Sequence, residues 1–81
     1  YYFERANAYS ASGQVAVALK DYNKAISLTG DESEYYFARG FAYQDLKNPK
    51  KMCRDLKSAC NLGDNQGCQL YNKECSSAKT P

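Results

Sequence analysis

The sequence contains no histidine, and this limits the chemistry that the chain can perform. Histidine is the side chain that enzymes use most often as a general acid or base. The sequence also lacks a glycine-rich phosphate loop and has no serine or cysteine with a base beside it, so no catalytic constellation is visible. We therefore expect a protein that is not an enzyme and that needs no cofactor.

Strong charge of one sign is also missing. The 11 lysines and arginines and 9 aspartates and glutamates leave a net charge of +2, which does not favour nucleic-acid binding. The basic stretch from Lys47 to Lys57 is interpreted as a solvated helix face, since no aromatic residues are interleaved with its cations. No apolar run is long enough to cross a membrane, and neither an initiator methionine nor a signal segment is present.

What the sequence does contain is an internal repeat with a period of 34 residues. Residues 1–5 (YYFER) return as residues 35–39 (YYFAR), and Asp21 and Ala25 align with Asp55 and Ala59. A fixed period of this length is typical of stacked helical units.

Each unit of the repeat contains two segments with helical periodicity. In the first unit, Ser12-Gly13 ends the first helix, and the second helix runs from Val15 to Leu28 with Thr29-Gly30 as its end. The core-facing positions of these two helices, read from the spacing of apolar and small residues, are Tyr2, Arg5, Ala6, Tyr9, Val15, Ala18, Leu19, Tyr22, Ala25, Ile26 and Leu28.

The second unit follows the same plan. Asp31 or Ser33 is the expected N-cap of its first helix, and Asn48-Pro49 should start its second helix. The apolar stripe of that second helix consists of Met52, Leu56, Ala59 and Leu62. Arg5 and Arg39 recur with Asp21 and Asp55, which predicts an ion pair between the two helices of each unit.

We expect an all-α protein, an α-solenoid of two hairpins closed by a capping helix, in a single domain over residues 1–81. Repeat 1 spans 1–34 and repeat 2 spans 35–64. The capping helix, from about residue 65 to 75, and a polar tail complete the segment 65–81. Solenoids usually need about three units to be stable, and the pattern begins inside a helix, so we expect the chain to be a fragment of a longer protein.

The 34-residue period, the aromatic–small–aromatic first helices and the run from Ala18 to Ile26 (ALKDYNKAI) resemble the tetratricopeptide repeat (TPR). The resemblance covers about residues 1–62. Met52 and Leu56 depart from it, because the family usually has alanine and an aromatic residue there. The resemblance implies a concave groove, lined by the first helix of each unit, that binds a protein or peptide.

The same resemblance identifies five candidate peptide-binding residues: Phe3, Asn7, Phe37, Phe41 and Gln44. Packing between repeats is the alternative role for Phe3 and Phe37. Phe41 is the clearest candidate, since its counterpart in the first unit is Asn7 and the core therefore does not require an aromatic there. The family's carboxylate-binding members have basic residues at these positions, so the phenylalanines favour an apolar or aromatic partner segment.

Two other roles are open at this stage. The chain could be the terminal, capping part of a longer array whose binding surface lies elsewhere, or an auxiliary domain of a larger secreted protein. End-to-end self-association is a further possibility, because the hairpin face at the Tyr1 end is left bare.

The four cysteines, Cys53, Cys60, Cys68 and Cys75, are symmetric about the Gly63-Asp64 turn. Residues seven apart on a helix are about 10.5 Å apart, beyond the limit of roughly 7 Å for a disulfide, and the same spread argues against a zinc site. An antiparallel hairpin instead places Cys60 opposite Cys68 and Cys53 opposite Cys75. Free, buried cysteines are the alternative.

Residues 59–68 (ACNLGDNQGC) resemble the bridged turn of Sel-like cysteine-rich helical repeats, in which this spacing carries a disulfide. Each bridge would add about 2–4 kcal/mol to a chain with a modest core. Disulfides persist in oxidising compartments, so the implied location is the periplasm or the outside of the cell.

Overall fold

The computed structural model describes residues 1–76, and the regular structure within that range is entirely helical. In chain order the elements are α1 (Tyr2–Ala11), α2 (Val15–Leu28), α3 (Ser33–Asp45), α4 (Pro49–Asn61), α5 (Asn65–Leu70) and a π-helix, η1 (Tyr71–Ser76). The expected all-α repeat fold is confirmed. The tail expected after Cys75 begins with Ser76, which the structure assigns to η1, and its other residues lie outside the described range.

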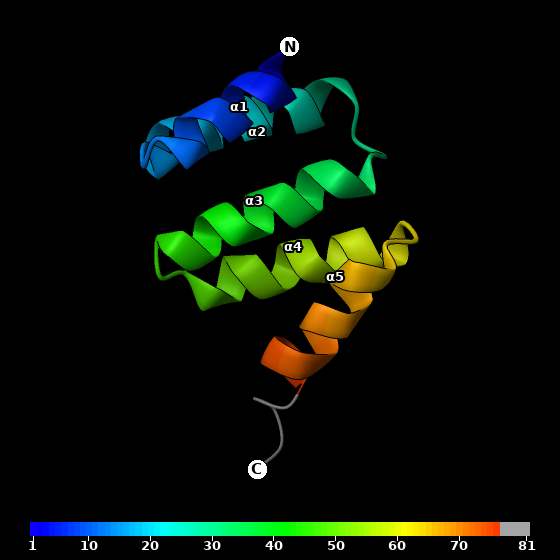
Figure 1. Ribbon diagram of the computed structural model, residues 1–81. Helices are drawn as coiled ribbons and strands as arrows, with labels where there is room; N and C mark the ends of the chain where they lie inside the picture. The colour runs from blue at the N-terminus through cyan, green and yellow to red at the C-terminus, as the bar shows by residue number, and fades with distance from the viewer. Residues whose placement is uncertain (77–81) are drawn as a thin grey trace.

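The helices stack as two hairpins and a final helical segment (Figure 1). The α1–α2 hairpin lies on the α3–α4 hairpin, with α2 against α3. After α4, α5 lies at the end of the stack away from α1 and α2. The stack is elongated, with extents of 40 × 24 × 16 Å. The last helical segment therefore covers the hairpin face that α1 and α2 do not reach.

Small residues form much of the core, which allows the helices to approach closely. Ala6 and Ala18 are fully buried at the α1–α2 contact, with Tyr22 and Ala42 in the same cluster. A second cluster holds α3, α4 and η1 together and contains Tyr43, Met52, Leu56 and Cys75. Leu19 packs against both clusters, so the two repeats share one continuous apolar interior.

An arginine on the first helix of each repeat binds an aspartate on the second helix, which confirms the predicted ion pairs. Arg5 donates from Nε and Nη2 to the carboxylate of Asp21 at 2.7 and 2.9 Å, and Arg39 binds Asp55 in the same way at 2.9 and 2.8 Å. Arg5 holds the pKa of Asp21 below its usual value through these hydrogen bonds, so this pair persists at lower pH than a free aspartate would allow.

The two ion pairs differ in burial. The Arg5 side chain is 42% exposed, whereas Arg39 is 14% exposed and Asp55 only 1%. Arg39 also donates from Nη1 to Oδ1 of Asn23 on α2, at 2.8 Å. The second pair thus connects the two repeats as well as the two helices of its own hairpin.

Two leucines that the sequence pattern placed in the core are exposed. Leu28 is 63% exposed and Leu62 is 43% exposed. At about 100° per residue, each leucine lies about 120° around the helix from the buried residue six positions earlier, Tyr22 or Leu56. The apolar face of each helix ends before that angle, so the prediction for these two positions was wrong.

The helix ends were only partly predicted. Asn48 caps α4 as expected, since its side chain accepts a hydrogen bond from the Lys51 backbone N–H and Pro49 follows at the first helical position. The N-cap of α3, however, is Glu32, which makes no side-chain capping bond, rather than Asp31 or Ser33. Gly30, expected to end α2, is not among the residues with positive φ.

Lys47 occupies a backbone conformation that favours glycine, with φ at 58°. Its counterpart one repeat earlier is Gly13, at φ 89°. We expect Lys47→Gly to raise the free energy of unfolding by about 0.5–1 kcal/mol, because a side chain in the left-handed region is strained. Urea unfolding followed by circular dichroism would measure this change. Gly13→Ala is the matched control and should lower stability; a loss of stability in both variants would contradict the strain argument.

The last helix approaches α4 closely at Gly67. A Cβ built on Gly67 would lie 3.0 Å from Cβ of Ala59 and 3.3 Å from the Cys60 backbone nitrogen, so only glycine fits there without a shift. The expected capping helix forms, but it is α-helical only to Leu70 and continues as a π-helix. A π-helical turn changes which side chains face α4 in the last segment.

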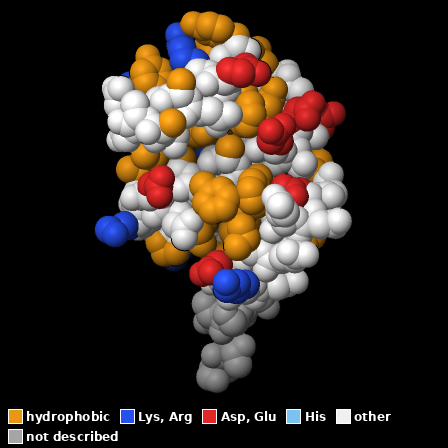
Figure 2. Space-filling view, in the orientation of Figure 1, with side chains coloured by type: hydrophobic (Ala, Val, Ile, Leu, Met, Phe, Trp, Pro, Cys, Tyr) orange, Lys and Arg blue, Asp and Glu red, His pale blue; other side chains and the backbone are white. Residues whose placement is uncertain are grey.

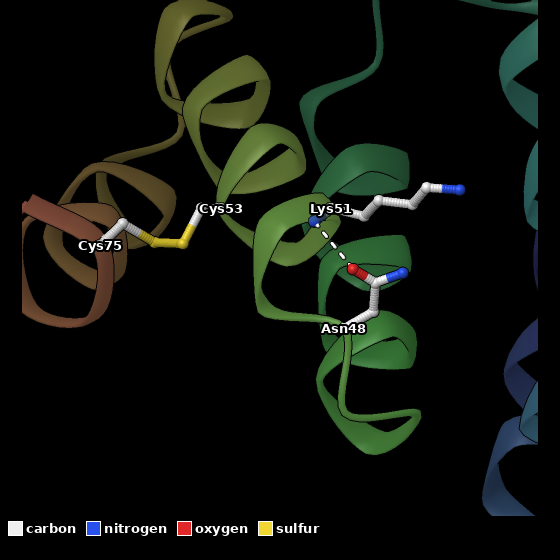
Figure 3. Close-up of a disulfide and its surroundings, with 4 residues drawn as sticks. All are labelled: Asn48, Lys51, Cys53 and Cys75. Carbon is white, nitrogen blue, oxygen red and sulfur yellow. Dashed lines mark hydrogen bonds between the residues drawn. A yellow bond between two sulfur atoms is a disulfide. The ribbon is translucent and has the colours of Figure 1, made fainter. Parts of the chain in front are cut away.

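The four cysteines join this last segment to α4. Cys60 is bonded to Cys68 on α5 with the Cα atoms 4.5 Å apart, and Cys53 is bonded to Cys75 on η1 with the Cα atoms 5.8 Å apart. Figure 3 shows the second disulfide between the start of α4 and the final helix. No free cysteine occurs within residues 1–76.

Candidate peptide-binding groove

A hollow of about 520 Å³ lies between α3 and the last helical segment. Phe37 and Phe41 form the α3 side, one turn apart on the same helix face. Their rings meet edge to face, with centroids 4.9 Å apart and an interplanar angle of 88°. The opposite side consists of residues from α5 and the start of η1: Gln66, Gln69, Leu70 and Lys73. We call this hollow the aromatic groove.

Phe41 is the exposed apolar surface of the aromatic groove. Its side chain is 43% exposed, whereas Phe37 is half-buried and packs on the core cluster of α3, α4 and η1. Figure 2 shows hydrophobic side chains gathered near the middle of this face of the molecule. The covalent links between α4 and the last helix hold the second wall in place.

Gln44 lies beside the aromatic groove in a smaller hollow of about 50 Å³. Phe41 and Leu70 line both hollows, so the two are adjacent. Gln44 is exposed and adds a polar side chain one turn beyond Phe41. This end of the groove therefore offers hydrogen-bonding groups next to an aromatic surface.

The structure places the other two candidates, Phe3 and Asn7, outside the aromatic groove. The Phe3 ring packs against Tyr35 at a centroid distance of 4.5 Å and against Tyr22 at 6.0 Å, so it joins the two repeats. Asn7 is exposed, and its Oδ1 accepts a hydrogen bond of 2.6 Å from the Tyr22 hydroxyl. Three of the five predicted residues are thus brought together, and the other two both contact Tyr22 of the first repeat.

Sequence reasoning missed the second wall of the groove. The last helix was interpreted as a cap, and Gln66 and Gln69 were not considered as site residues. A signal was present, because the helix that follows two hairpins takes the place of the first helix of a third unit. Its residues then face the same side as those of α1 and α3.

Two further features are absent from the described part of the chain. No group of three or more cysteine, aspartate or glutamate residues in positions 1–76 could hold a metal ion. None of the helices in this range is long and apolar enough to cross a membrane.

Comparison with protein families matches residues 6–47 to the TPR repeat. The match runs from the middle of α1 to just beyond α3 and covers slightly more than half of the chain. A search among curated proteins found no match. TPR repeats generally mediate protein–protein interactions and are typically not enzymes. With the matched repeat and the stacked helical hairpins both in place, the chain belongs to the TPR family.

Proposed function

We propose that the aromatic groove binds an apolar or aromatic segment of a partner protein. The observation that carries this proposal is the exposure of Phe41, at 43%, in a hollow that is otherwise lined by Phe37, Leu70 and polar side chains. The equivalent residue of the first repeat is Asn7, so the fold does not need a phenylalanine at this place. Exposed aromatic side chains in a hollow are typical anchors for a partner.

The chemistry of the groove favours a peptide that presents one large apolar side chain. Phe37 and Phe41 offer a ring face and a ring edge, which suit an aromatic or aliphatic group. Gln44, Gln66 and Gln69 carry amides that can bind the peptide backbone. The groove contains no arginine, so it lacks the fork-shaped donor that binds a carboxylate most tightly.

Phe41→Ala is expected to weaken binding of an apolar peptide about tenfold or more, as truncating an anchor residue usually does. The measurement is fluorescence anisotropy with labelled peptides selected on the wild-type chain from a random library. Leu46→Ala is the matched control: Leu46 is 42% exposed, close to Phe41, but does not line the groove. Equal binding by both variants, or no peptide selected at all, would disprove the proposal.

We also infer that the chain works in an oxidising compartment, either the periplasm or the outside of the cell. The support is the pair of disulfides between α4 and the last helix, since such bonds are rare where thiols are kept reduced. The bridged α4–α5 turn is also similar to that of Sel-like cysteine-rich repeats, which we propose as relatives of this C-terminal part.

A further inference from the structure

A second hollow, of about 480 Å³, lies between α4 and η1 beside the Cys53–Cys75 disulfide. Three cations from α4 line it, namely Lys50, Arg54 and Lys57, and η1 contributes Tyr71 and Glu74. We call it the basic groove. It lies on the second helix of its hairpin, whereas Phe37 and Phe41 of the aromatic groove are on the first.

The cations of the basic groove are available to a ligand. Lys50, Arg54 and Lys57 lie at positions i, i+4 and i+7, on one face of α4, and all three are exposed. None of them makes an ion pair or a side-chain hydrogen bond within residues 1–76. With Glu74, the groove carries three positive charges and one negative charge, a net of +2 that equals the net charge of the whole chain.

One of these cations stands where helix electrostatics favours an acid. Lys50 is in the first turn of α4, which contains no acidic residue; the first turns of α2 and α5 contain none either, whereas those of α1 and α3 contain Glu4 and Glu34. The N-terminus of a helix carries a partial positive charge, so a lysine there lowers stability and an acidic group raises it. Lys50 breaks this charge preference, and no acidic side chain in the first turn of α4 offsets it. Such an uncompensated charge is expected where an anionic group of a ligand binds.

The basic groove also has an apolar surface. Tyr71 is half-buried, and its ring lines the groove together with the disulfide and Pro49. The covalent bond between Cys53 and Cys75 fixes the distance between the two walls, and Figure 3 shows this bond between α4 and the last helix. A ligand would therefore meet a preformed site that combines positive charge with an aromatic ring.

We propose that the basic groove binds an acidic peptide segment of a partner protein, with an aromatic or aliphatic side chain between its carboxylates. The cations extend over seven residues of α4, about 10.5 Å, which matches about three residues of an extended peptide. The three cations favour acidic residues in the peptide, and Tyr71 favours an apolar side chain between them. A nucleic acid fits less well, because single-stranded binding uses several stacked aromatics along a longer basic path.

The test uses a labelled hexapeptide of alternating glutamate and phenylalanine, added to the isotope-labelled 81-residue chain with its disulfides intact. Backbone amide shifts should change at Lys50, Arg54, Lys57 and Tyr71. Lys50→Glu should weaken binding about tenfold, since an attraction is replaced by a repulsion of similar size. The same variant should melt at an equal or higher temperature, because an acid in the first turn suits the helix. Loss of binding would then not be a result of unfolding.

Lys20→Glu is the matched control. Lys20 is the counterpart of Arg54 one repeat earlier and is exposed on α2, so the variant has the same net charge as Lys50→Glu but an intact groove. It should bind the peptide as wild type does. Shift changes at Phe41 and Gln69 instead, equal loss in both variants, equally tight binding of a six-nucleotide single-stranded DNA, or no binding at millimolar peptide would each overturn the proposal.

Discussion

Arg39→Ala is expected to lower the free energy of unfolding by about 3 kcal/mol, because it leaves the carboxylate of Asp55 buried without its partner. Asp55 is 1% exposed, and its carboxylate oxygens accept hydrogen bonds from Nε and Nη2 of Arg39. The variant also loses the bond from Arg39 to Asn23 on α2. A domain of this size is stable by only about 4–12 kcal/mol, so this one change would remove a large part of the total.

The equivalent variant in the first repeat is the control for this prediction. Arg5→Ala removes the same hydrogen bonds from Asp21, but the Arg5 side chain is 42% exposed and water can replace it. Its cost should be clearly smaller than that of Arg39→Ala. Urea unfolding with intact disulfides would compare the two, and a cycle with Asp55→Ala should show that losses at Arg39 and Asp55 are not additive. If Arg5→Ala and Arg39→Ala lowered the free energy of unfolding equally, the burial of the ion pair would not determine the cost of losing the arginine.

Replacing both Cys53 and Cys75 with alanine is expected to cost about 3 kcal/mol, which is the larger effect of removing either disulfide alone. The bond joins residues 22 apart in sequence, so its loss frees a long loop in the unfolded chain. Cys75 is 3% exposed and packs with Tyr43, Met52 and Leu56, so η1 would also lose part of its contact with α4.

The Cys60–Cys68 disulfide supplies the comparison. Cys60 and Cys68 are 8 residues apart, so the variant with alanine at both positions should lose less, about 2.5 kcal/mol. Mass spectrometry of the non-reduced, digested protein should first find both pairs in the wild type. Four free thiols, or a larger loss for the short loop than for the long one, would contradict this account of the stability of the last helix.

Much of the fold follows from the sequence pattern alone. The 34-residue period predicted the two hairpins, and the recurrence of arginine and aspartate at the same offset predicted both ion pairs. Ala6, Ala18 and Ala25 are buried as their spacing indicated. These features depend on residues that are close together in the chain or one period apart. In a helix with 3.6 residues per turn, such spacing determines which side chains share a face.

The proposed binding surfaces could be predicted only in part. Phe37, Phe41 and Gln44 became candidates through the resemblance to the TPR, but the wall opposite them comes from α5 and η1. The sequence analysis interpreted the basic stretch as a plain solvated face, since no aromatic residue is interleaved with its cations. The structure brings Tyr71 beside it from 14 residues beyond Lys57.

The amino-acid order was enough to establish the repeat, its ion pairs and the family. The packing of distant segments was needed to show that the final helix is one wall of two grooves and that Leu28 and Leu62 are exposed. The reason is physical: a helical period states which residues share a face, but not where the apolar face ends or which helix covers it. For the last helix, they depend on how closely it approaches α4 at Gly67 and on where the disulfides hold it.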